Sequence, residues 1–335
     1  MIIDVHAHAI SGELADEMTR GPWLGLHLEK LPDGGFAHPI TGLLPPLFFD
    51  LEGRLGSLEE RGVGLQLISP PISIFTDQGL AGGVEQARRL NECTAKLVEE
   101  SGGLLGGLAI PCLSDPPRIP DELRRAVETH GFRGAALPTT AAGRFLDGPD
   151  FEPMFAALET LGLFTFLHPY PNLLHKSLED YSLVTLVGFP TETTIAVSRL
   201  IYAGVLERHP GLKLVLAHGG GTLAFLNGRL NLGYFAPKYE FNPDCQKNIP
   251  KPPGEYIQQL YFDSLVSSGE SLRFLVDLVG ADRVMFGTDF PFEVGDPEGR
   301  ATLPAIQQMP EADREKILSG NAAALLADAG VKNSH

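Results

Sequence analysis

Cysteine, tryptophan and positive charge are all scarce in this sequence of 335 residues. It has three cysteines and one tryptophan, and 26 Lys and Arg residues face 42 Asp and Glu residues, which gives a net charge of −16. No run of lysine and arginine is present, so the sequence indicates neither a nucleic-acid partner nor binding to an anionic membrane. A small anionic substrate is still compatible with this charge, because a metal ion or a few local cations reverse its sign inside a cleft.

The few cysteines and the start of the chain bear on the cellular compartment. Cys93, Cys112 and Cys245 form an odd, scattered set, so we expect free thiols in a reducing cytoplasm. Met1–Asp4 offers no positively charged region of a signal peptide. Uncharged stretches such as Gly34–Phe49 are too short and too rich in proline to span a bilayer. We therefore expect a cytoplasmic protein without a membrane partner.

Eight short apolar runs recur along the chain, and glycine, proline or polar residues close each of them. Most runs are continuously apolar, as in strands that are buried on both faces. The runs are Ile2–Ala9, Gly64–Ser69, Leu104–Ile110, Gly134–Leu137, Leu163–His168, Lys213–His218, Gln259–Phe262 and Arg283–Gly287. Helical patterns lie between them, and Val84–Glu100 is the clearest.

Eight strands that alternate with helices predict an α/β fold, a single (β/α)₈ TIM barrel that spans residues 1–335 as one domain. An open doubly wound sheet is the alternative, but no GxGxxG motif follows the first strand. Two segments do not fit the repeat: Ser11–Leu51 after strand one and Leu232–Tyr256 after strand six. We interpret both as insertions that cover the site or meet a second subunit. The second is rich in proline and aromatic residues, so we predict that it forms a homodimer interface.

Polar side chains stand where four of the apolar runs end. His6 and His8 close the first run on one face of the strand, His168 closes the fifth, His218 the sixth and Asp289 the eighth. The carboxyl ends of all strands in a barrel meet at one mouth, where active sites are built. Imidazole nitrogens and carboxylates bind metal ions. The five residues together therefore predict a metal site at this mouth, although each histidine alone is also compatible with simple packing.

Six segments, spread nearly from end to end, carry a resemblance to a known family. They are Ile3–His8, Gly62–Ser69, Val187–Thr194, Ala217–Gly221, Gly228-Arg229 and Gly287–Phe292. In these segments the chain resembles the decarboxylase branch of the amidohydrolase superfamily, and it looks most like the 2-amino-3-carboxymuconate-6-semialdehyde decarboxylases.

The resemblance implies a metal site with defined roles. His6, His8, His168 and Asp289 would bind one divalent ion, and His218 would be the acid/base residue beside a metal-bound water. Three imidazoles and a carboxylate suit Zn²⁺, and Mn²⁺ or Co²⁺ also fits. The fourth run ends in Leu137-Pro138-Thr139 without the lysine that two-metal amidohydrolases use, so we expect a single ion and no organic cofactor.

The reaction that the resemblance implies is a metal-dependent, non-oxidative decarboxylation. The proton that replaces CO₂ would come from His218 in the semialdehyde branch and from Asp289 in the branch that acts on aromatic acids, and the sequence leaves both open. Hydrolysis of an amide, a lactone or an activated carbon–carbon bond is the alternative with the same residues. A non-catalytic metal-binding barrel is a minor alternative.

The sequence departs from this family at two positions. The semialdehyde enzymes hold substrate carboxylates with arginines, and here Gly42 and Pro237-Lys238 stand at those places. A lysine at 238 offers a point charge but no bidentate fork. We therefore predict a flatter, less charged substrate, such as a salicylate-like or hydroxypicolinate-like acid, with carboxymuconate semialdehyde as the other candidate. The predicted substrate contacts are Trp23, Tyr170, His175, Arg229, Lys238 and Phe290. Arg54 is interpreted as a surface or structural ion pair.

Overall fold

The centre of the fold is a parallel sheet of eight strands. The computed structural model describes residues 1–20, 28–38, 42–71, 83–170, 176–236 and 243–329. The strand order is β1-β5-β6-β7-β10-β11-β12-β13. The bounds are β1 (Ile2–His8), β5 (Val63–Ser69), β6 (Leu105–Ala109), β7 (Gly134–Pro138), β10 (Phe164–His168), β11 (Lys213–Leu216), β12 (Tyr261–Asp263) and β13 (Val284–Met285). Each strand coincides with one of the eight apolar runs, so the predicted strands are confirmed.

Backbone hydrogen bonds join the two edges of this sheet. The amide of Val5 donates to the carbonyl of Phe286 at 2.9 Å, the amide of Asp289 donates to His6 at 2.8 Å, and the amide of His8 donates to Phe290 at 2.7 Å. The sheet therefore closes nearly completely, which confirms the TIM barrel and excludes the open doubly wound sheet.

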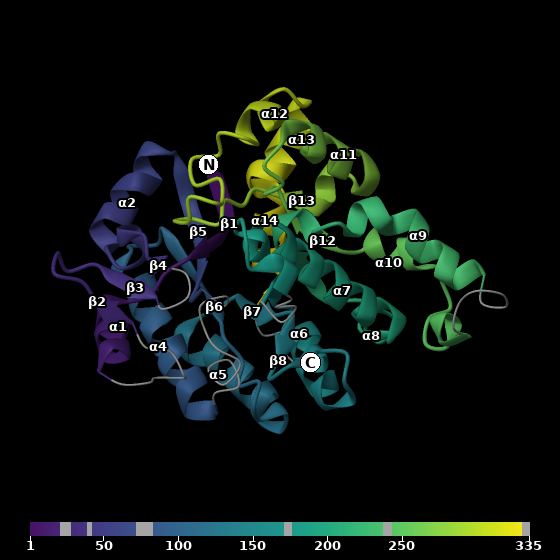
Figure 1. Ribbon diagram of the computed structural model, residues 1–335, viewed down its shortest axis with the longest axis horizontal. Helices are drawn as coiled ribbons and strands as arrows, with labels where there is room; N and C mark the ends of the chain where they lie inside the picture. Colours follow the sequence, from purple (N-terminus) through teal and green to yellow (C-terminus); the bar gives the residue numbers. More distant parts are fainter. Residues whose placement is uncertain (21–27, 39–41, 72–82, 171–175, 237–242, 330–335) are drawn as a thin grey trace.

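Helices surround the strands, as Figure 1 shows. The principal ones are α2 (Leu51–Glu60), α4 (Val84–Glu100), α5 (Ile119–His130), α6 (Glu152–Thr160), α7 (Phe189–Tyr202), α8 (Val205–Arg208), α9 (Leu223–Phe235), α11 (Gly269–Val279) and α14 (Asn321–Ala327). Their termini follow local sequence signals. Asp50 caps α2 by accepting a hydrogen bond from the Gly53 amide, and Ser268 caps α11 in the same way. Short helices α12 (Leu303–Gln307) and α13 (Glu311–Glu315) precede α14.

The continuous apolar character of the strands follows from burial on both faces. On β10, Phe164 and Phe166 belong to one buried cluster, which also contains Val5 and Met285. Leu167 of the same strand belongs to a second cluster, which includes residues of the surrounding helices. Alternate residues therefore pack inside the barrel and beneath its helices. Polar side chains such as Asp4 of β1 and Gln66 of β5 are also buried within the strands.

The two segments predicted as insertions contain small elements at opposite ends of the view in Figure 1. The described part of Ser11–Leu51 holds α1 (Gly12–Thr19) and an antiparallel sheet of β2 (Glu29–Lys30), β3 (Phe36–His38) and β4 (Gly42–Leu43). The described part of Leu232–Tyr256 holds the end of α9 and most of α10 (Pro253–Ile257). A hairpin that the sequence analysis did not predict, β8 (Thr140–Ala141) with β9 (Arg144–Phe145), follows β7.

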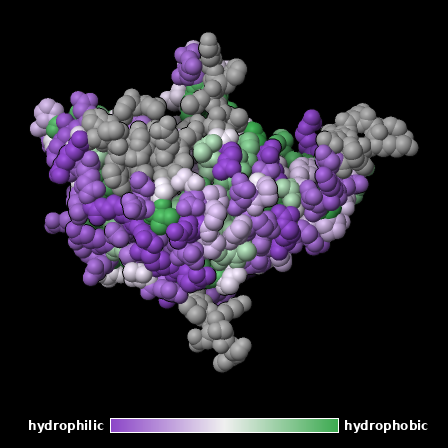
Figure 2. Space-filling model, turned by 90° about the horizontal axis from the view of Figure 1, so that it is seen from below, coloured by the Kyte–Doolittle hydropathy of each residue, from purple (hydrophilic) through white to green (hydrophobic). Residues whose placement is uncertain are grey.

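The face in Figure 2 is mostly hydrophilic. Within the described ranges, no helix is both long enough and apolar enough to cross a membrane. Cys93, Cys112 and Cys245 are free thiols, as predicted.

Candidate metal centre

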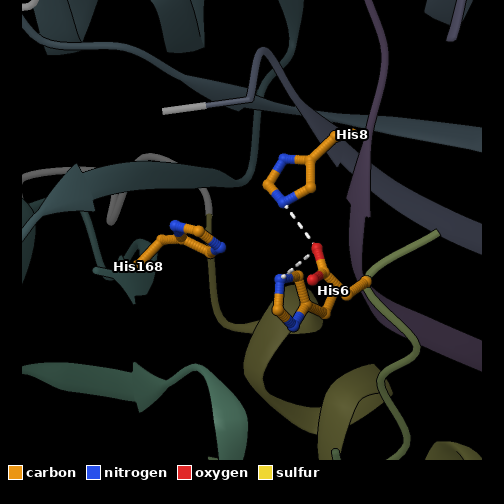
Figure 3. Close-up of side chains that lie close together, drawn as sticks. His6, His8 and His168 are labelled. Carbon is orange, nitrogen blue, oxygen red and sulfur yellow. Dashed lines mark ion pairs between the residues drawn. The ribbon is translucent and has the colours of Figure 1, made fainter. Parts of the chain in front are cut away.

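Four side chains from three parts of the barrel converge at its mouth. His6 and His8 lie at the end of β1, His168 ends β10, and Asp289 follows β13. Each of the four side chains offers one nitrogen or oxygen atom as a ligand, and these four atoms all lie within 4.8 Å of one another. Figure 3 shows the imidazole rings of His6, His8 and His168 around a common centre. These residues form a divalent metal site.

In each of the three imidazoles, Nδ1, the ring nitrogen that points away from the common centre, contacts a polar group of the surrounding protein. The partner of Nδ1 is Asp263 Oδ2 at 2.7 Å for His6, Ser69 Oγ at 3.4 Å for His8, and the carbonyl oxygen of Pro169 at 3.0 Å for His168. These contacts turn Nε2 of each ring toward the common centre. The three Nε2 atoms and Asp289 Oδ1 are buried without a hydrogen-bond partner in the structure. A buried polar atom without a partner is costly, and a bound metal ion removes that cost here.

The charges of the four groups fit a cation. Burial raises the pKa of Asp289, but His6, His218 and His8 lower it further, so the pKa lies well below its usual value and the group is a carboxylate. Burial lowers the pKa of His8, and burial together with the neighbouring histidines lowers that of His168 well below its usual value. Both rings are therefore neutral, as a metal ligand must be.

His6 is the exception among the ligands. Burial lowers its pKa, but Asp289 and Asp263 outweigh burial and raise the pKa to about 10. The Nε2 atom of His6 lies 3.2 Å from Asp289 Oδ1, so a proton on this nitrogen compensates the carboxylate. A divalent cation at the centre would take the place of that proton.

His218 lies beside the four ligands and is the most accessible of the five predicted residues. Its side chain is 16% exposed, and its Nε2 atom lies 3.6 Å from Asp289 Oδ2. Both His218 and Asp289 have a positive φ, 55° and 58°, which is uncommon for residues other than glycine. Such backbone strain costs about 1–3 kcal/mol per residue and gathers at functional sites.

Two aspartates near the centre were missed by the sequence analysis. Asp263 is the last residue of β12 and accepts hydrogen bonds from His6, from the amide of His218 and from that of Gly219. Asp4 lies inside β1, is fully buried, and accepts hydrogen bonds from Thr288. Asp263 directly follows the run Gln259–Phe262, so the strand-end pattern that located the other residues also applies to it.

Two aromatic rings flank the histidines. Phe292 lies 5.8 Å from the ring of His8, and Phe189 lies 6.3 Å from that of His168 and 6.5 Å from that of His218. Both phenylalanines are only partly buried, whereas His8 and His168 are buried. The exposed parts of these rings therefore give the centre an apolar border. The sequence analysis did not select Phe189.

The predicted substrate contacts are spread over different environments. Tyr170, which follows His168 by two residues in the sequence, is buried, and its amide donates to Thr139 Oγ1 at 3.0 Å. Phe290 is buried, with its ring centroid 4.8 Å from the guanidinium of Arg54 and 4.3 Å from that of Arg61, a placement that favours packing. Arg229 is exposed on α9. The others, Trp23, His175 and Lys238, lie outside the described residues.

Arg54 is not a surface residue, which corrects part of its interpretation. It is 1% exposed, and its guanidinium donates to the carbonyl oxygens of Leu47 and His8 and to Gln66 Oε1. These hydrogen bonds satisfy the buried charge of Arg54. Among the described residues, no carboxylate forms an ion pair with it within 4 Å.

A family comparison agrees with the site. The model of the amidohydrolase family matches residues 3–327. The chain belongs to the amidohydrolase family. It is 32% identical over 334 residues to a 2-amino-3-carboxymuconate-6-semialdehyde decarboxylase of Dictyostelium discoideum, which covers 96% of this chain and 90% of that protein. It is 29% identical to the gamma-resorcylate decarboxylase of Rhodococcus jostii, over 81% of this chain and 86% of that protein.

Solved structures share the fold. A 5-carboxyvanillate decarboxylase of Novosphingobium aromaticivorans, with bound manganese and 3-methoxy-4-hydroxy-5-nitrobenzoic acid, has a TM-score of 0.80 and 21% identity over 98% of this chain and 97% of that chain. A dihydroxybenzoic acid decarboxylase of Polaromonas sp. JS666, with bound manganese and 2-nitroresorcinol, has a TM-score of 0.74 and 22% identity over 100% of this chain and 99% of that chain. Together with its relatives and its metal site, the family places this chain among the metal-dependent decarboxylases.

The geometry predicts one ion per chain. Purified protein should hold about one divalent ion, and the double variant His6→Ala with His8→Ala should lose it, because half of the ligand set is removed. The ligands lie at the strand ends and not inside the apolar core, so the metal-free protein should keep its far-UV circular dichroism. Elemental analysis that finds two ions per chain, or unfolding on chelation, would contradict this prediction.

Proposed function

We propose that the protein catalyses the non-oxidative decarboxylation of a small hydroxylated aromatic or heteroaromatic acid, with carboxymuconate semialdehyde as the other candidate. The observation that carries this proposal is the convergence of three unpartnered imidazole nitrogens and one carboxylate oxygen beside His218. The rings of Phe189 and Phe292 support a flat substrate. Gly42 of β4, where the semialdehyde enzymes have an arginine, offers no cation for a second carboxylate.

We propose Zn²⁺ as the ion, with Mn²⁺ or Co²⁺ as replacements, because three imidazoles and one carboxylate suit it. When bound, the ion supplies Lewis acidity that orients a substrate carboxylate and withdraws electron density from the adjacent oxygen. His6, His8, His168 and Asp289 would hold it.

The protein side chains account for the proton. The bond between the substrate carbon and its carboxylate breaks, CO₂ leaves, and the electron pair stays on that carbon, which then takes up a proton. His218 and Asp289 are the two candidate donors, and Asp289, which is a carboxylate in the structure, would first take up a proton from a hydroxyl or carboxyl group of the substrate. His218 Nε2 lies 3.6 Å from Asp289 Oδ2, so both groups reach the same side of the centre.

A product analysis tests the proposed reaction. Metal-loaded protein should release CO₂ from at least one acid in a panel of hydroxybenzoates, hydroxypicolinates and carboxymuconate semialdehyde. The His6→Ala and His8→Ala double variant is the matched control and should be inactive. A hydrolysed product would support the hydrolase alternative, and no turnover of the whole panel would count against the substrate class.

Two variants separate the roles of His218 and Asp289. His218→Ala should retain the metal, because His218 is not a ligand, and should lose about 10²–10⁴-fold in kcat if it transfers the proton. Asp289→Asn keeps an oxygen ligand but carries no exchangeable carboxyl proton. An inactive, metal-bound Asp289→Asn beside an active His218→Ala would assign the proton to Asp289. If both variants keep activity within about tenfold, the catalytic assignment is wrong.

We further propose that the protein is a cytoplasmic homodimer. Three apolar side chains of α9 are open to solvent: Phe225 is 80% exposed, Leu232 is 54% and Phe235 is 66%. Two of them belong to the segment Leu232–Tyr256, which was predicted as an interface. Large apolar side chains gathered on one exposed helix are typical of a surface that meets a partner.

Sedimentation velocity at micromolar concentration tests this state. The native protein should sediment as a dimer, and the double variant Leu232→Asp with Phe235→Asp should sediment as a monomer, because two charges would be buried at the interface. Leu186→Asp is the control, since Leu186 is equally apolar, is 56% exposed and lies outside both predicted insertions. A native monomer would contradict the proposal.

A further inference from the structure

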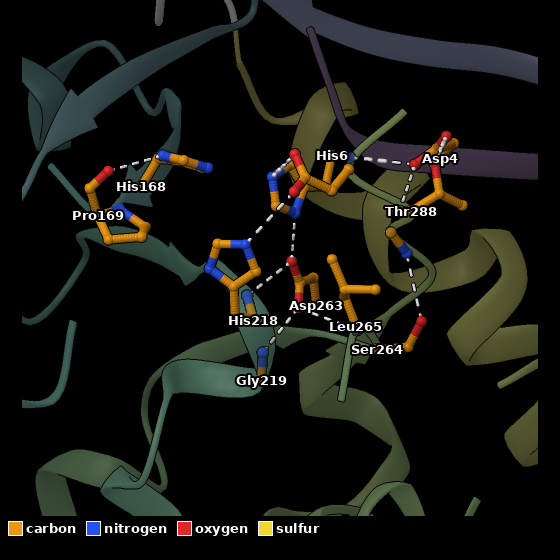
Figure 4. Close-up of polar contacts among 12 residues, drawn as sticks. Asp4, His6, His168, Pro169, His218, Gly219, Asp263, Ser264, Leu265 and Thr288 are labelled. Carbon is orange, nitrogen blue, oxygen red and sulfur yellow. Dashed lines mark hydrogen bonds and ion pairs between the residues drawn. The ribbon is translucent and has the colours of Figure 1, made fainter. Parts of the chain in front are cut away.

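Asp263 joins two parts of the site that otherwise belong to different strands. It is fully buried, and its two oxygens accept four hydrogen bonds. The Oδ2 atom accepts from His6 Nδ1 at 2.7 Å and from the amide of His218 at 3.0 Å. The Oδ1 atom accepts from the amide of Gly219 at 2.8 Å and from that of Leu265 at 3.1 Å. Figure 4 shows this carboxylate between the ring of His6 and the backbone of His218 and Gly219.

We infer that Asp263 is a positioning residue that couples metal binding at His6 to the placement of His218. A single oxygen, Oδ2, holds both groups, so a displacement of one changes the hydrogen bond of the other. The part that concerns His218 rests on the proposed function, since His218 matters there as a proton-transfer residue. The part that concerns His6 depends only on the metal site.

The backbone after β11 is built around this carboxylate. His218, Gly219 and Gly220 all have positive φ, 55°, 60° and 72°. Successive amides in such a turn point to one side and form a concave site for an anion. The amides of His218 and Gly219 use this site to bind Asp263. The negative charge of Asp263 therefore stabilises the strained conformation of His218.

The other side of the carboxylate acts on the metal ligand. A carboxylate that accepts from Nδ1 fixes the orientation of an imidazole and raises the basicity of Nε2, and losing it costs about 10–100-fold in metal affinity or activity. His8 and His168 have neutral partners at Nδ1, a hydroxyl and a carbonyl oxygen. Among the three histidine ligands, His6 alone has a charged one, so Asp263 has its strongest effect there.

The first experiment replaces the carboxylate by an amide of nearly the same shape. In Asp263→Asn, one oxygen becomes a donor that opposes His6 Nδ1 or the backbone amides. We expect Zn²⁺ affinity, measured by chelator competition with metal-free protein, to fall by about 10–100-fold. We also expect kcat at saturating Zn²⁺ to fall at least tenfold, with a smaller change in KM.

Glu122→Gln is the matched control for the loss of a buried carboxylate. Glu122 of α5 is 2% exposed and accepts hydrogen bonds from Arg88 and Asn91 of α4 and from Arg125 of α5, none of which is a metal ligand. This variant should lose stability but keep the native Zn²⁺ affinity and kcat. An equal loss of affinity in Glu122→Gln would show a general effect of destabilisation and would overturn the coupling.

A second variant changes Gly219, whose amide donates to the Asp263 carboxylate. It keeps the proposal testable if Asp263→Asn does not fold. A Cβ at residue 219 would lie 2.2 Å from Val266 Cγ1, and the φ of 60° at this position is strained for a residue with a side chain, so Gly219→Ala disturbs the turn. Gly219 contacts no metal ligand directly. We nevertheless expect Gly219→Ala to weaken Zn²⁺ binding severalfold through Asp263, and the added change Val266→Ala to restore part of the affinity by removing the clash.

The outcomes distinguish a coupling between His6 and His218 from independent effects of Asp263 on each of them. Weaker Zn²⁺ binding in both Asp263→Asn and Gly219→Ala supports the coupling. Native Zn²⁺ affinity in Gly219→Ala, or native kcat in Asp263→Asn at saturating Zn²⁺, overturns it. If the native enzyme turns over no acid of the panel, the proposed substrate class fails, whereas the Zn²⁺ affinities of Gly219→Ala and of the same variant with Val266→Ala still decide the inference.

Discussion

The hydrogen bonds that close the barrel between β1 and the segment after β13 determine where the metal site forms. The Asp289 amide donates to the His6 carbonyl oxygen, and the His8 amide donates to that of Phe290, so the carboxylate ligand alternates in register with the two histidines. We call this junction between β1 and the segment after β13 the seam, and Asp4 stabilises it. It accepts from Thr288 Oγ1 at 2.7 Å and from Gln66 Nε2 at 2.8 Å, and so it ties β1 to both of its neighbours.

A buried guanidinium supports the same seam from the outside. Arg54 donates to Gln66 Oε1 at 2.6 Å and to the carbonyl oxygen of His8, while its guanidinium carbon lies over the Phe290 ring. Burial lowers the pKa of Arg54, and the nearby carboxylate of Asp4 opposes that shift. The positive charge is thus held beneath the ligand strand by hydrogen bonds and by an aromatic ring. The ends of β1 and of the Asp289 segment are fixed by interactions that include no metal ligand side chain.

Much of the fold and the metal ligands could be predicted because their signals are local. A strand buried on both faces is continuously apolar, so His168 and His218 stand out at the strand ends, and the barrel rule then brings them together. Asp263 also stands at a strand end, but its contacts with the left-handed turn after the neighbouring strand β11 arise only in the folded chain. Arg54 at a helix start resembles a surface residue, because its partners at 8, 47 and 66 are assembled only in the folded chain. Phe189 was missed for the same reason.

An acidic chain repels an anionic substrate such as the proposed acid, and the metal centre determines how this repulsion is overcome. Asp289 and Asp263 place two buried carboxylates beside the four imidazoles, and one proton on His6 compensates only part of that charge. A substrate carboxylate that approaches the metal-free centre therefore meets net negative charge in a region where solvent screens little. A divalent cation among the ligands reverses the sign locally, although the chain as a whole has a net charge of −16. Binding of the acid and binding of the metal are thus linked by electrostatics, which explains how so acidic a protein can select an anion without an arginine at position 42.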